Sequence, residues 1–217
     1  MNTSAAHPEA VDPESQAEAE ITLGMLNAVE GNSVLTQLSL ARELGIALGL
    51  VNAYLKRCVT KGLIKVTHAP ARRYAYYLTP QGFAEKSRLT AQYLAISFDF
   101  FRLARSQCSA LFAECEARGW TRLALCGAGE LAEIAMLCAE SQAVTLIGLV
   151  ETAGGPGVGR LPLVGDLAAL ASPDAVVITD QRTPQQTYDR TVAVLAPERV
   201  LAPRLLNISR TPPRLAE

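Results

Sequence analysis

A stretch between residues 36 and 79 limits most tightly how this chain can fold. It contains two runs of apolar residues at helical spacing, separated by a short turn, and the runs stop at Gly45 and Gly62. Glycine often ends a helix because it adopts the left-handed backbone conformation without steric cost. The sequence therefore predicts two short helices joined by a tight turn. The side chains expected to face inward are Leu38, Ala41 and Leu44 in the first helix and Val51, Leu55 and Val59 in the second.

Two strands are expected after the second helix. Residues 63–68 form the first strand, in which successive side chains point to opposite faces, and residues 74–79 form the returning partner. The connection between them carries two consecutive arginines, Arg72 and Arg73. Helix, turn, helix, strand, basic tip and strand is the element order of a winged helix-turn-helix, a module used chiefly to bind duplex DNA. We predict such a domain over residues 14–80.

The net charge of −1 conceals an uneven distribution of charged residues. Residues 1–30 hold six acidic and no basic side chains, whereas residues 31–88 hold nine basic and two acidic ones. Positive charge concentrated on one module attracts the phosphate backbone of nucleic acid. A solvated basic face without a partner is the alternative interpretation.

The predicted DNA contacts lie on the exposed side of the second helix and at the tip between the strands. Asn52 can recognise adenine through two hydrogen bonds, and Lys56 can contact guanine or, more commonly, a phosphate. The first turn of this helix is apolar, however, from Ala47 to Leu50, where a base-reading helix would normally be polar. For Arg57 and Lys61, a solvated helix face without a DNA contact is the competing interpretation. The full predicted set is Asn52, Lys56, Arg57, Lys61, Arg72 and Arg73.

The segments ARELGI (41–46), KGLIKV (61–66) and YAYYLTPQG (74–82) resemble the MarR-like winged-helix regulators, especially those associated with exopolysaccharide gene clusters. The resemblance covers roughly residues 15–110. It implies a transcription factor that binds double-stranded DNA as a homodimer. It also implies that the second helix enters the major groove and that the wing contacts the backbone.

One long helix is predicted over residues 81–118, preceded by Thr79 and Pro80 and stopped by Gly119. Two apolar stripes indicate that it packs both on its own domain and on a partner subunit. The family resemblance gives the same role, because this helix builds the dimer there. Two cysteines share one stripe, which leaves two interpretations: inert buried thiols, or a redox-sensitive disulfide between subunits. The stripes are Leu94, Phe101, Ala104, Cys108, Leu111 and Cys115, and Tyr93, Ile96, Phe100 and Leu103.

Residues 120–205 alternate short apolar strands with helices, which predicts a Rossmann-like parallel α/β domain covered on both faces. The segment GAGELA directly follows the first strand and fits the G-x-G-x-x-G/A dinucleotide fingerprint. In that fingerprint, Gly127 permits the tight turn and Gly129 lets the backbone approach a pyrophosphate. An acid at the end of the next strand would bind an adenine ribose and favour NAD over NADP. The predicted cofactor-binding residues are Gly127, Ala128, Gly129, Glu130, Leu131, Glu151, Thr179 and Asp180.

GAGELA, Glu151, GVGRLPLVGDLAAL (157–170) and AVVIT (175–179) resemble the CoA-binding-type domain of Rex, a redox-sensing repressor, and the nucleotide-sugar-binding half of sugar O-acyltransferases. The glycine loop is also similar to that of nucleotide-sugar dehydratases. These resemblances imply NAD(H), CoA or a nucleotide sugar as ligand. A purely structural domain is the alternative, and Glu130 favours it because a carboxylate in the first helical turn repels phosphate.

The remaining features exclude several functional classes. Five cysteines without CxxC spacing argue against a disulfide framework and a structural zinc site. With 49% hydrophobic residues but no long apolar run, we expect no membrane span and a cytoplasmic protein. Residues 1–13 and 206–217 are expected to be tails.

Catalysis is not expected, because the two histidines, His7 and His68, both lie far from the α/β domain in sequence. We therefore expect a dimeric DNA-binding regulator whose α/β domain senses a nucleotide-type ligand and controls polysaccharide or redox genes. The alternatives are an α/β domain that only mediates assembly, and a nucleotide-dependent enzyme.

Overall fold

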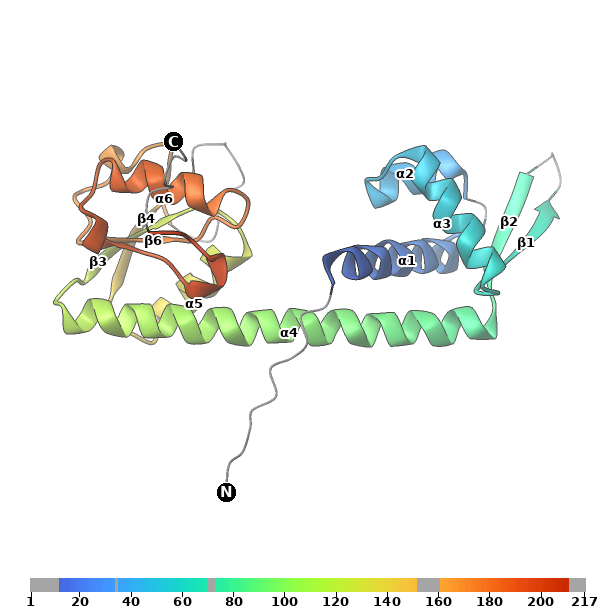
Figure 1. Cartoon of the computed structure of the whole chain (residues 1–217), viewed down its shortest axis with the longest axis horizontal. Helices are drawn as coiled ribbons and strands as arrows, with labels where there is room; N and C mark the ends of the chain where they lie inside the picture. Colours follow the sequence, from blue (N-terminus) through green and yellow to red (C-terminus); the bar gives the residue numbers. More distant parts are fainter. Residues whose placement is uncertain (1–11, 34, 70–72, 152–160, 211–217) are drawn as a thin grey trace, which may run out of the picture. The chain divides into compact units, whose positions relative to one another are not determined.

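The computed structural model describes residues 12–33, 35–69, 73–151 and 161–210. The chain divides into two compact units, Met1–Ser97 and Phe98–Glu217, and the division falls within one long helix that contributes to both (Figure 1). Among the described residues, no single helix has the length and apolar character needed to cross a bilayer. One pair of helices, Gln37–Leu44 and Leu48–Thr60, meets that criterion only when the two are taken together across a 105° bend.

The first unit is a winged helix-turn-helix, as the sequence predicts. Thr36 starts its first short helix through a reciprocal capping box with Ser39, and Gly45 ends it with φ 64°. The two strands pair antiparallel, with Ile64 opposite Leu78. The elements are α1 (Pro13–Gly31), α2 (Gln37–Leu44), α3 (Leu48–Thr60), β1 (Ile64–Ala69), β2 (Arg73–Leu78) and the first part of α4 (Pro80–Ala117).

Two of the predicted inward-facing residues are wrong. Leu38 and Val59 are 52% and 38% exposed, and the inward positions belong to Leu40 and Cys58. The reason is that α1 also contributes to the core. The side of each short helix that becomes buried depends on where α1 packs against it, and this cannot be predicted from the spacing within the short helix alone. The core of this unit contains Met25, Leu26, Val29, Leu40, Val51, Leu55, Cys58, Ile64, Tyr76 and Leu89.

Helix α4 begins where the sequence predicts. The Thr79 hydroxyl accepts a hydrogen bond from the Gly82 N–H at 3.0 Å and donates one to the Gly62 carbonyl at 2.6 Å. The helix therefore starts against the end of α3. It ends at Ala117, and the chain then turns through Gly119 with φ 74°.

The second unit is a parallel α/β domain. Its sheet has the order β5-β4-β3-β6-β7, and every neighbouring pair is parallel. The central strand is β3: β4 and β5 lie on one side of it, and β6 and β7 lie on the other. The elements are β3 (Arg122–Cys126), α5 (Glu130–Ala139), β4 (Thr145–Val150), β5 (Leu163–Val164), β6 (Ala175–Ile178), α6 (Pro184–Val192), β7 (Val200–Leu201) and three 3-10 turns, Leu167–Ala169, Pro197–Arg199 and Arg204–Leu206.

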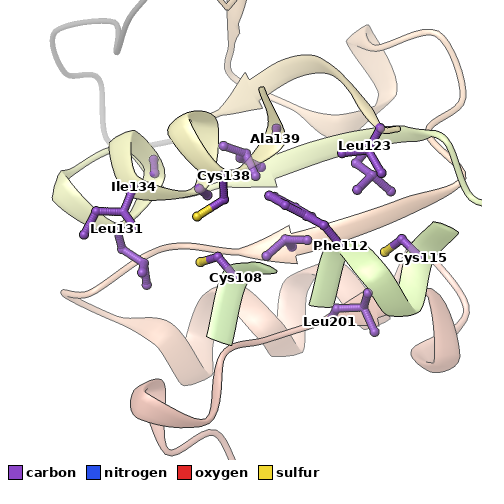
Figure 2. Close-up of a cluster of buried hydrophobic side chains, with 14 of the residues drawn as sticks. Cys108, Phe112, Cys115, Leu123, Leu131, Ile134, Cys138, Ala139 and Leu201 are labelled. Atoms are coloured by element: carbon purple, nitrogen blue, oxygen red, sulfur yellow. The ribbon is translucent and has the colours of Figure 1, made fainter. Parts of the chain in front are cut away.

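One face of this sheet packs against α4 and α5, and the other packs against α6. Figure 2 shows Cys108, Phe112 and Cys115 of α4 directed into the hydrophobic cluster between the sheet and helices α4 and α5, beside Cys138 of α5. Both α4 cysteines are fully buried there, and burial raises the pKa of Cys108 to about 12 and that of Cys115 to about 11. The inert-thiol interpretation fits this environment, because the thiolate needed for disulfide chemistry is disfavoured and the sulfur atoms face their own sheet.

Removal of the Phe112 ring should destabilise the second unit. Phe112 is the largest fully buried side chain, so Phe112→Ala should lower the free energy of unfolding by about 3–5 kcal/mol. Denaturant unfolding followed by circular dichroism measures the change. Leu137→Ala on α5, where the side chain is 58% exposed, is the matched control and should change stability by less than about 0.5 kcal/mol. Equal effects of the two changes would contradict the assigned core.

Candidate nucleic-acid interface and ligand pocket

Helix α3 has one buried and one exposed side. Val51 and Leu55 anchor it in the core, whereas Asn52 and Lys56 on its other side are exposed. The structure thus leaves the amide and the ammonium group available to a partner outside the domain. These two predicted DNA-binding residues lie one helical turn apart.

The N-terminus of α3 has an unusual cap. Ala47 holds the extended conformation of an N-cap residue, with φ −63° and ψ 143°, but it has no side-chain oxygen to accept from the first turn. The first turn also contains no acidic residue. Backbone N–H groups at a helix start favour anions, so a phosphate is the natural acceptor in this position.

The other predicted DNA contacts differ in their surroundings. The Arg57 guanidinium forms an ion pair with Glu18 of α1 at 2.7 Å, which competes with phosphate for this charge. Lys61 is exposed at the C-terminal end of α3. Arg72 lies outside the described residues, and Arg73 is placed only through its backbone, which pairs with Ala69. Of the predicted set, the structure brings together only the residues of α3.

The second unit contains a cavity of about 160 Å³ at the carboxyl ends of β3 and β4, on the side of the sheet covered by α6. Three predicted site residues, Gly127, Glu151 and Asp180, line it. Its other polar lining groups include Asp166 and, from α6, Thr187, Arg190 and Thr191. The α6 residues were not predicted, although their i, i+3, i+4 spacing marks one polar face of a helix.

Two backbone donors at the glycine turn and the start of α5 already have partners within the protein. The Ala128 N–H donates to the Glu151 carboxylate at 3.0 Å, and the Leu131 N–H donates to the Gln181 side-chain oxygen at 3.3 Å. These are the groups with which a dinucleotide-binding turn would hold a pyrophosphate. A pyrophosphate that binds these two N–H groups must therefore displace both side chains. Glu130 is exposed in the first turn of α5 and adds negative charge beside it.

Gly127 is required by chain packing. Its φ is 106°, and a Cβ at this position would lie 2.3 Å from the backbone nitrogen of Asp180. The loop after β6 therefore touches the turn directly. Gly129, with φ 146°, also adopts a backbone conformation that side chains rarely allow.

Thr179 and Asp180 hold this loop in place. Thr179 is fully buried, and its hydroxyl donates to the Gly127 carbonyl at 2.6 Å. Asp180 accepts from the N–H groups of Arg182 and Thr183 and from the hydroxyls of Thr183 and Thr187. Burial acts to raise the pKa of Asp180, but these hydrogen bonds outweigh it and the pKa is lowered. Its carboxylate is thus committed to the start of α6.

The described residues offer no group of three or more His, Cys, Asp or Glu side chains that could hold a metal ion. Cys126, which lines the cavity, is buried, and burial raises the pKa of its thiol to about 12. A thiol in that state is a poor nucleophile.

Residues 19–65 match a protein-family model described as winged helix-turn-helix DNA-binding. This segment lies within the winged helix-turn-helix of the first unit, whose second strand, β2, follows the matched residues. The match spans most of α1, the helix pair α2–α3 and the start of β1. A comparison with curated proteins found no match.

Several solved regulator structures show a partial likeness. MepR of Staphylococcus aureus, a transcription regulator of the multidrug efflux pump MepA, is 26% identical over 38% of this chain, with a TM-score of 0.33, and the match spans 61% of the MepR chain. PcaV of Streptomyces coelicolor, in complex with its natural ligand, is 20% identical over 46% of this chain and 84% of its own, with a TM-score of 0.35. The MarR family protein Rv2887 of Mycobacterium tuberculosis, in complex with p-aminosalicylic acid, is 19% identical over 35% of this chain and 66% of its own, with a TM-score of 0.31.

The uncapped start of α3 leads to a prediction in which stability and DNA affinity change in opposite directions. Ala47→Asp supplies the missing cap and should raise the free energy of unfolding by about 1 kcal/mol. The same carboxylate would repel a phosphate at this helix end, so duplex affinity should fall. Ala47→Ser is the control, because it supplies a cap without charge and should stabilise with less loss of affinity. Chemical unfolding and fluorescence anisotropy with a labelled duplex give the two values. Unchanged duplex affinity in Ala47→Asp would show that phosphate does not approach this end.

Gly127→Ala should destabilise the second unit in the absence of any ligand. The new Cβ meets the Asp180 backbone and the positive φ is strained, so a loss of about 2–5 kcal/mol is expected. Gly165→Ala is the control, since a Cβ at Gly165 meets nothing within 4 Å. Thermal unfolding of the purified proteins measures both. A Gly127→Ala protein as stable as the control would show that the turn is not closed by packing.

Proposed function

We propose that this chain is a DNA-binding transcription regulator that acts as a dimer and whose α/β domain senses a nucleotide-type ligand. The observation that carries the DNA-binding part of this proposal is the winged helix-turn-helix of the first unit, whose residues 19–65 match a DNA-binding family. Its charge supports the same function, because residues 31–88 hold nine basic and two acidic side chains.

The proposed dimer is supported by the middle of α4. Between residues 93 and 103, five large apolar side chains of this helix are between 37% and 57% exposed. Large apolar side chains exposed on a helix are often covered by another chain. A two-fold dimer would carry two copies of α3 to a pseudo-palindromic site. The five are Tyr93, Leu94, Phe98, Phe101 and Leu103.

Ligand sensing is supported by the topology of the sheet. Strand order reverses between β3 and β6, and ligands of open α/β sheets bind at the carboxyl ends of the strands beside such a reversal. The cavity of about 160 Å³ lies at these ends. The sequence resemblances name NAD(H), CoA and nucleotide sugars, and they place the regulated genes in polysaccharide or redox metabolism.

One observation favours the alternative in which the α/β domain only mediates assembly. Glu151 and Gln181 accept from the N–H groups of Ala128 and Leu131, so a diphosphate must displace both side chains to bind these two donors. A nucleotide ligand that regulates the protein would thus have to pay for this displacement from its contacts in the cavity. A coupling of about 1–3 kcal/mol between ligand and DNA would change duplex affinity several-fold to a hundred-fold.

The full-length protein, studied by native mass spectrometry and duplex anisotropy, tests these proposals. We expect a dimer that binds duplex DNA with an affinity that falls steeply as salt rises. Adding NAD⁺, NADH, CoA or a UDP-sugar should change that affinity for one of the four. Unchanged affinity with all four would leave assembly as the role of the α/β domain, and no duplex binding at low salt would overturn the regulator itself.

A further inference from the structure

The exposed side of α3 contains apolar side chains beside its polar ones. Leu48 and Val59 are 45% and 38% exposed. Together with Asn52 and Lys56 they follow the spacing i, i+4, i+8 and i+11, which places them along one side of the helix. Leu48 lies in the first turn, the part of a recognition helix that contacts base edges.

Apolar side chains can read one feature of the major groove. Of the four bases, only thymine presents a methyl group there, whereas every other readable feature is a hydrogen-bond donor or acceptor. A leucine cannot discriminate guanine or cytosine by hydrogen bonding. The complementary polar group is close by, because Asn52 can pair with the N6 and N7 atoms of adenine.

The spacing of these two residues matches DNA. Four residues of helix rise roughly 6 Å, and adjacent base pairs are about 3.4 Å apart, so the two side chains reach base pairs one or two steps apart. Gly49 lies between them and Ala53 follows Asn52; both are exposed, and a Cβ at Gly49 meets nothing within 4 Å. These small residues let the helix backbone come close to the base edges.

We propose that Leu48 reads the C5 methyl group of a thymine next to an adenine read by Asn52, so that the centre of each DNA half-site consists of A·T pairs. This inference rests on the proposed DNA-binding function. A protein partner on the same apolar side is less consistent with the first turn, which contains neither an acid nor a side-chain cap and so suits phosphate.

The test exchanges thymine for deoxyuridine, which removes only the methyl group. Full-length protein first selects its preferred duplex from a random-sequence pool. Each thymine of that duplex is then replaced singly by deoxyuridine, and affinities are measured by anisotropy. The wild-type protein should lose roughly fourfold in Kd at the contacted thymine, which is the value of one buried methylene. Leu48→Ala should bind the thymine duplex more weakly and lose its response to deoxyuridine at that position.

Leu137→Ala is the matched control, because it removes another exposed leucine, 58% against 45% for Leu48, from the other unit and should keep the wild-type response. If the wild-type protein binds a selected duplex but no deoxyuridine weakens it, or if Leu48→Ala keeps the full response, the inference about Leu48 is overturned while DNA binding stands. Capture of a protein partner through Leu48 with a duplex response unchanged would overturn it as well. If the pool yields no bound duplex, the proposed function itself fails.

Discussion

The packing of α4 against the parallel sheet is the interaction on which the second unit depends. A sheet built from β3, β4 and β6 is apolar on both faces and needs a cover on each. Residues Ala104, Cys108, Phe112 and Cys115 supply part of that cover, and each is fully buried. Earlier on the same helix, Leu89 is buried in the core of the first unit, whereas Leu94, Phe98 and Phe101 are exposed. That division of one helix between a core and an exposed surface underlies the proposed dimer.

The function of the winged helix-turn-helix is supported by more observations than that of the α/β domain. The winged helix-turn-helix has its charge, its fold and a family match in agreement. The α/β domain has the topology and a cavity of a ligand-binding fold, but its glycine turn is closed by Glu151 and Gln181. A fingerprint describes which backbone conformations are possible, and it does not describe which neighbouring side chains reach the freed N–H groups.

Much of the fold could be predicted from local signals. The left-handed glycines at Gly45, Gly62 and Gly119 all end helices or turns where the sequence predicts them, because φ > 0 is a local property of glycine. The helix start at Thr79 was equally readable. Prediction failed for Leu38 and Val59, because the side of a short helix that becomes buried is decided by the helices that pack against it.

The sequence by itself determined the order of elements, the basic module and the glycine turn, since these follow from backbone preferences and from charge along the chain. Only the tertiary structure decided that Glu151 would bind the turn, that Asp180 would accept from the Thr183 and Thr187 hydroxyls of α6 and its N-cap, and that Cys108 and Cys115 would be buried in a core. The physical reason is distance along the chain: Glu151 lies 23 residues from its partner Ala128, and Cys108 contacts a sheet formed by residues that follow it. Such contacts depend on how the strands and helices pack, which no local spacing contains.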